Sequence, residues 1–115
     1  KAKLWKKQLY FLEYPNKLEP SWFGLPILID KKYFKIKKKY LKILNENKIE
    51  TRPILSGNFM NQRSIDLYKL NPKKKIFKNS QEIEDRGFFI GLHTTPISNA
   101  KLQTLVKNLL LIDKI

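Results

Sequence analysis

Two stretches decide the fold of this chain: PSWFGLPI at residues 20–27 and TRPILSGNFMNQ at residues 51–62. The first is a short run of bulky apolar residues, which is typical of a strand. The second begins as a strand and continues into a polar loop that carries one arginine and several amides. Planar hydrogen-bonding groups would then lie beside aromatic side chains at two strand ends. The sequence therefore predicts the edge of a ligand site here.

Hydrophobic spacing predicts the elements around these stretches. Asp30 and Ser98 are expected to be N-caps, and Asn79 with Glu82 is expected to open a short helix as a capping pair. Pro26 cannot donate to a β-ladder, so its strand is expected at an edge or to be irregular there. The predicted helices cover residues 2–12, 31–44, 63–70, 79–86 and 99–110, and the predicted strands cover residues 22–29, 49–55 and 88–92.

This order of elements predicts an α+β fold, organised as a small domain of the α/β type. The expected sheet has about three strands, with helices packed on one face. Residues 1–14 are interpreted as a helix that enters from a missing upstream domain, and residues 15–115 as one small domain. Because the only methionine is Met60, we expect the chain to be a piece of a longer protein.

The composition bounds the function classes. The 115 residues carry a formal net charge of +14, with 42% hydrophobic residues, which predicts one basic globular domain. Nucleic acid is not the expected partner, because only three of the 24 basic residues are the arginines that base and phosphate recognition favours. The alternative function is a stand-alone basic module that binds nucleic acid or an acidic partner.

Several kinds of site are not expected. The chain has no cysteine and one histidine, His93, so no metal site is predicted. No apolar run reaches the roughly 18 residues of a membrane span, and no membrane partner is expected. Arg52 could bind a carboxylate or a diphosphate, and His93 could act as an acid or base. These residues do not make a complete catalytic set, so no catalytic residue is assigned.

Three motifs in order nevertheless resemble one known family: SWFGLP at 21–26, TRPILSGN at 51–58 with Gln62, and GFFIGLH at 87–93. They resemble the C-terminal small domain of the DegT/DnrJ/StrS-type aminotransferases, which depend on pyridoxal phosphate and act on nucleotide sugars. The nearest branch contains the nucleotide-sugar 3-dehydrases. The resemblance covers residues 15–112. The chain departs from the family motifs at Arg63-Ser64 and at residues 94–96. The resemblance therefore does not identify the precise substrate.

The resemblance implies a cytoplasmic, homodimeric parent enzyme that acts on 4-keto-6-deoxy nucleotide sugars for surface polysaccharide. Pyridoxal phosphate or pyridoxamine phosphate would support either amino transfer or loss of the C3 hydroxyl. The cofactor's main contacts belong to the large domain, so this chain alone is expected to be inactive and not to bind the cofactor. The residues that the resemblance places at the substrate or cofactor pocket are Trp22, Arg52, Ser56, Gly57, Asn58, Gln62 and His93.

Overall fold

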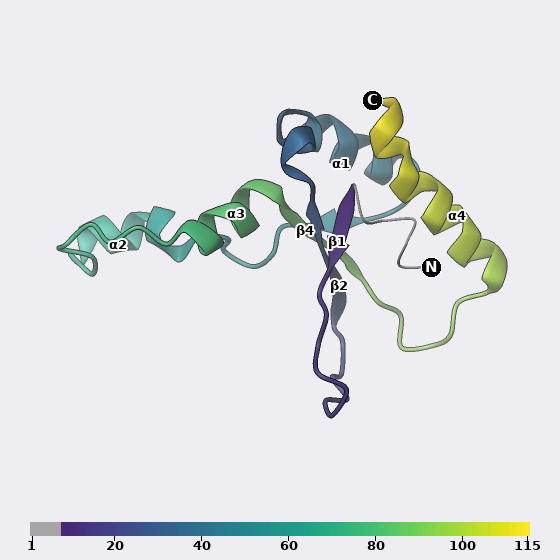
Figure 1. Ribbon diagram of the computed structural model, residues 1–115, viewed down its shortest axis with the longest axis horizontal. Coiled ribbons are helices and arrows are strands. Elements are labelled where there is room, and N and C mark those ends of the chain that lie inside the picture. Colours follow the sequence, from purple (N-terminus) through teal and green to yellow (C-terminus); the bar gives the residue numbers. More distant parts are fainter. Residues whose placement is uncertain (1–7) are drawn as a thin grey trace.

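A four-stranded antiparallel sheet organises the computed structural model, which describes residues 8–115 (Figure 1). The strands β1 (Leu9–Phe11), β2 (Gly24–Ile29), β3 (Thr51–Arg52) and β4 (Gly87–Gly91) lie in the order β1-β2-β4-β3. The α+β class is confirmed, with one strand more than the sequence predicted.

Helices connect β2 to β3 and β3 to β4, and two more follow β4. Asp30 caps the first of them by accepting a hydrogen bond from the Lys32 amide at 3.1 Å, and Ser98 accepts from the Lys101 amide at 3.4 Å, so both predicted caps are confirmed. No helix among residues 8–115 is long and apolar enough to cross a membrane. The helices are η2 (Lys31–Ile36), α1 (Lys37–Glu46), η3 (Phe59–Asn61), α2 (Arg63–Leu67), α3 (Lys78–Arg86), α4 (Asn99–Leu109) and η4 (Leu110–Lys114).

The core lies between one face of the sheet and the helices α1 and α4 (Figure 1). Ile27 and Phe88 are opposite each other in β2 and β4, and both are fully buried. Tyr40 of α1 lies edge-on to Phe88 with ring centroids 6.0 Å apart, and its hydroxyl donates to the Leu109 carbonyl at 2.8 Å. This contact joins α1 to α4 over the sheet.

The predicted helix over residues 2–12 is wrong where the structure describes it. Residues 1–7 lie outside the described part, and Leu9–Phe11 form the strand β1. Leu9 pairs with Ile29 and is 1% exposed. The apolar residues have helical spacing, but Tyr10 and Phe11 favour a strand, and pairing with β2 decides the outcome.

Three further predictions need correction. The strand expected over residues 49–55 is confined to Thr51–Arg52, because Pro53 has no N–H for the ladder. The helix α3 begins at Lys78, so Asn79 is inside its first turn and does not cap it. β2 is interior in the strand order, although Pro26 lies one residue beyond the β1 ladder and has only β4 as its neighbour.

The molecule is extended for its length. Its radius of gyration is 16.2 Å, against about 13 Å for a compact domain of about 100 residues. Figure 1 shows the reason: α2 and α3 project to the left of the sheet, away from α1 and α4. This arrangement leaves the loop between β3 and α2 to be held mainly by α3.

Two carboxyl groups each accept a hydrogen bond from a tyrosine hydroxyl, and they predict acid sensitivity. The Tyr33 hydroxyl donates to Asp113, and the Tyr10 hydroxyl donates to Asp30 at 2.7 Å. These bonds lower the pKa of both carboxyls below their usual range. The resulting stability is therefore complete above the ordinary carboxyl pKa of about 4 and is lost as the pH falls through the lowered values.

We expect the urea midpoint of the wild type to be lower at pH 3 than at pH 6. Asp113→Asn should reduce this difference, because it lowers the midpoint mainly at pH 6. Asp66→Asn is the matched control, since Asp66 is exposed on α2. A pH profile of Asp113→Asn that parallels the wild type would contradict the role given to Asp113.

Candidate functional site

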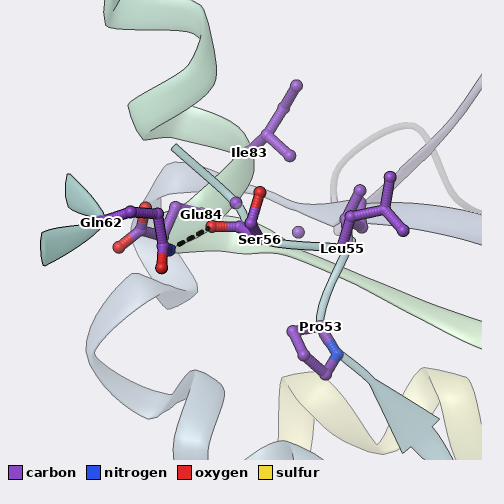
Figure 2. Close-up of a pocket in the computed structure, with 9 residues that line it drawn as sticks. Pro53, Leu55, Ser56, Gln62, Ile83 and Glu84 are labelled. Carbon is purple, nitrogen blue, oxygen red and sulfur yellow. Dashed lines mark hydrogen bonds between the residues drawn. The ribbon is translucent and has the colours of Figure 1, made fainter. Parts of the chain in front are cut away.

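The loop that follows β3, residues 53–62, forms one side of a pocket with a volume of about 240 Å³; we call it the pocket loop. The other side comes from the last turn of α3 and the start of β4. Figure 2 shows Gln62 beside Ser56, where its Nε2 donates to the Ser56 carbonyl at 3.2 Å. The pocket is lined by Pro53, Ile54, Leu55, Ser56, Gly57, Gln62, Ile83, Glu84 and Gly87.

The pocket loop makes its turn through two residues with left-handed backbone. Leu55 has φ 45° and Gly57 has φ 63°, and the Gly57 amide donates to the Ile54 carbonyl at 2.9 Å. A Cβ at Gly57 would lie 2.8 Å from Cγ of Glu84. Glycine is therefore required here both by the backbone conformation and by the close approach of α3.

Amide and carboxylate groups join the pocket loop to α3. The Asn58 side chain donates to Gln81 Oε1 at 3.0 Å and accepts from the Met60 amide at 3.2 Å. Asn61 donates to the same Gln81 oxygen at 3.0 Å. Glu84 accepts from the Asn58 backbone amide at 2.7 Å and from Asn61 at 3.0 Å. With both its donor and its acceptor used and only 6% of its surface exposed, Asn58 shapes the loop without lining the pocket.

Sequence reasoning did not find Glu84. The acidic run Glu82, Glu84 and Asp85 is typical of a solvated helix start, and 26 residues separate Glu84 from Asn58 along the chain. The spacing of Gln81 and Glu84 was the available signal, because residues i and i+3 lie on the same face of a helix. Only the folded structure shows that this face meets the pocket loop.

The seven predicted site residues divide into separate groups. Ser56, Gly57 and Gln62 line the pocket, and Asn58 is the next residue after Gly57 but does not line it. Arg52 is outside it: the side chain is exposed on β3 and pairs with Glu50, with NH2 and Oε1 2.7 Å apart.

Trp22 and His93 lie at the other end of the sheet. Gly24 is opposite Gly91 in the ladder, and the Leu92 amide donates to the Phe23 carbonyl at 3.3 Å, so both residues lie beyond the last strand pair. Gly87 lines the pocket, and the strand from Gly87 to Gly91 spans about 13 Å. Trp22 contacts the Tyr14 ring at 5.7 Å, and His93 is exposed. The structure therefore does not bring these two residues to the pocket.

The pocket is suited to hydrogen-bond donors. Its one ionisable lining group is the Glu84 carboxylate, and no lysine, arginine or histidine is among the lining residues. Lys37 is near, but its Nζ donates to the Glu84 backbone carbonyl at 2.8 Å, and partial burial lowers its pKa. A phosphate ester would meet a carboxylate here, so the pocket residues do not by themselves fit pyridoxal phosphate. Within residues 8–115 no three potential metal ligands come together.

Comparison with curated proteins gives related sequences, although no protein-family profile matches the chain. The GDP-4-keto-6-deoxy-D-mannose 3-dehydratase of Escherichia coli is 33% identical over 75 residues, which is 65% of this chain and 19% of that protein. The lipopolysaccharide biosynthesis protein RfbH of Salmonella typhimurium is 34% identical over 89 residues, which is 72% of this chain and 20% of that protein. The chain thus spans about a fifth of the length of these relatives.

Solved structures agree with these sequences. A GDP-4-keto-6-deoxymannose-3-dehydratase mutant with bound GDP-perosamine matches 90% of this chain and 26% of its own length, with a TM-score of 0.73 and 27% identity. The E. coli enzyme with bound hydrated pyridoxal phosphate matches with a TM-score of 0.71 and 27% identity, over 90% of this chain and 26% of its own length. In sequence and in fold, the chain is a homologue of part of these 3-dehydratases, as its motifs predicted.

Proposed function

We propose that this chain forms one wall of the substrate site in an enzyme that removes the C3 hydroxyl from a GDP-linked 4-keto-6-deoxy sugar for surface polysaccharide. The observation that carries the proposal is the match of 90% of the chain to 3-dehydratase structures at a TM-score of up to 0.73. Dehydration is preferred to amino transfer because two of the curated relatives are named 3-dehydratases. As the sequence predicted, we expect a cytoplasmic homodimer with a large domain.

The cofactor of the proposed enzyme is pyridoxal phosphate, which is bound in one of the similar structures. Since the lining of the pocket carries a carboxylate and no cation, we assign the cofactor to the rest of the enzyme. We expect this chain to contribute contacts to the substrate. No chemical step is assigned to its own side chains.

We assign Arg52 to an anionic group of the substrate, because a guanidinium binds a diphosphate through two parallel hydrogen bonds. Its present partner, Glu50, is 72% exposed in its side chain and can be replaced by an incoming anion. Ser56 and Gln62 would bind sugar hydroxyls in the pocket, and Asn58 with Gly57 would keep the loop in shape. Trp22 and His93 would contact the ligand only from the other end of the sheet.

The test uses the full-length enzyme and follows water loss from GDP-4-keto-6-deoxymannose. Arg52→Ala is expected to lower kcat/KM by about tenfold or more, since a hydrogen bond to a charged group contributes about 1.5–3 kcal/mol. Lys38→Glu and Lys39→Glu are matched controls on the exposed face of α1 and are expected to leave activity unchanged. No turnover in the wild type would reject the proposed reaction, and equal activity in all variants would reject the role of Arg52.

The alternative of a basic binding module makes the opposite prediction. In that case the Lys38 and Lys39 variants would lose affinity for nucleic acid, with a steep dependence on salt. The relatives named above are a GDP-sugar 3-dehydratase and a lipopolysaccharide biosynthesis protein, which favours the first function.

A further inference from the structure

Beyond Ile54, which packs against Gly87 of β4, the pocket loop has little apolar packing to hold it. Leu55 is 87% exposed and Phe59 is 52% exposed, so neither side chain fixes the loop by burial. The bonds from Gly57 to Ile54 and from Gln62 to Ser56 begin and end within the loop. They shape the turn but do not fix its position relative to the sheet.

The hydrogen bonds that join the loop to α3 end on Gln81 and Glu84. Of these two residues, Glu84 also packs against the turn itself, with its Cβ and Cγ 2.9 and 2.8 Å from the place where Gly57 would carry a Cβ. Its Oε2 accepts from the Asn58 amide at 2.7 Å, and both its oxygens lie 3.0–3.1 Å from Asn61 Nδ2. A carboxylate that accepts a backbone N–H makes one of the stronger kinds of hydrogen bond in proteins.

We propose that Glu84 is a positioning residue, which holds the pocket loop against α3 through the Asn58 amide and so sets the place of Ser56 and Gln62 in the pocket. The inference rests on the proposed function only for what the pocket binds. The geometry of the Glu84 contact does not depend on that function. The proposal gives the acidic α3 a role in the site, although its carboxylate need not touch the ligand.

Two other ionisable groups lie near Glu84. Lys37 of α1 donates to its backbone carbonyl, and Asp85 is the next residue of α3 and accepts from Gln81 at 2.9 Å. Asp85 carries a carboxyl group like that of Glu84, so variants are needed to separate the two. The effect of Glu84 is therefore the pH-dependent change in chemical shift that is lost when only Glu84 is substituted.

The experiment is a pH titration of the ¹⁵N-labelled chain by NMR, with Glu84→Gln, Glu84→Ala and the control Glu46→Gln, whose residue is exposed on α1. In the wild type, the Asn58 backbone amide and the Asn61 side-chain amide are expected to shift with one carboxyl titration. In Glu84→Gln that titration is lost, and hydrogen exchange at the Asn58 amide becomes about tenfold faster or more. Glu46→Gln should leave both unchanged.

If the chemical shift of the Asn58 amide did not change with pH in the wild type, the proposal would be overturned. This measurement needs no variant to fold. The proposal would also be overturned if the rate of hydrogen exchange at the Asn58 amide were unchanged in both Glu84 variants. The signals of Tyr40 and Ile90 would show that the core of these variants is intact. In the full-length enzyme, Glu84→Gln is further expected to raise KM by about tenfold with little change in kcat. Failure of the proposed reaction would remove this last readout and leave the NMR result standing.

Discussion

Replacing Gly57 by alanine is expected to lower the free energy of unfolding by about 2–5 kcal/mol. An L-residue in the left-handed conformation costs roughly 1–2 kcal/mol, and overpacking costs about 1–3 kcal/mol more. Both terms apply, because Gly57 has φ 63° and its new methyl group would lie 2.8–3.0 Å from three atoms of Glu84. The Glu84 Cβ is close to the helix backbone and can move only if α3 or the loop moves.

Gly91→Ala is the matched control, because a Cβ there would have no atom within 4 Å. It is expected to change the free energy of unfolding by less than about 0.5 kcal/mol. Urea denaturation of both variants gives the comparison. If Gly57→Ala were as stable as Gly91→Ala, the close approach of the loop to α3 would be wrong, and the pocket would lose the wall that defines it.

Local signals predicted the parts of the fold that local chemistry decides. The carboxylate of Asp30 and the hydroxyl of Ser98 cap helices where expected, since each acts on an amide two or three residues away. The strand β1 was missed because its state depends on pairing with β2, 16 to 20 residues along the chain. Spacing within residues 2–12 carries no information about that partner.

The candidate site shows the same limit. The motif around residues 51–62 correctly indicated a polar loop after a strand, and three of its predicted residues line the pocket. The motifs did not reveal that Trp22 and His93 lie at the opposite end of β4, because that separation follows from the antiparallel register. Nor could they reveal Glu84, whose role depends on how α3 is oriented against the sheet.

Arg86 fixes that orientation, and Arg86→Met is expected to lower the free energy of unfolding by about 2–3 kcal/mol. Arg86 is 9% exposed, and its guanidinium donates to the Ile29 carbonyl at 2.6 Å and to Glu82 at 2.6 Å. Methionine fills part of the space but leaves the carbonyl of fully buried Ile29 without this donor. Glu82 is 38% exposed in its side chain and can recover water, so the loss is smaller than for a fully buried pair.

The exposed Arg63→Met is the matched control and is expected to be nearly neutral in urea denaturation. Arg86→Lys should recover only part of the loss, because an ammonium cannot donate to both partners with the geometry of a guanidinium. The bond from Arg86 to Ile29 attaches α3 to β2, and Glu84 attaches the pocket loop to α3. Arg86→Met should therefore also speed hydrogen exchange at the Asn58 amide. A variant that is destabilised but keeps that amide protected would show that the loop is held independently of the helix end.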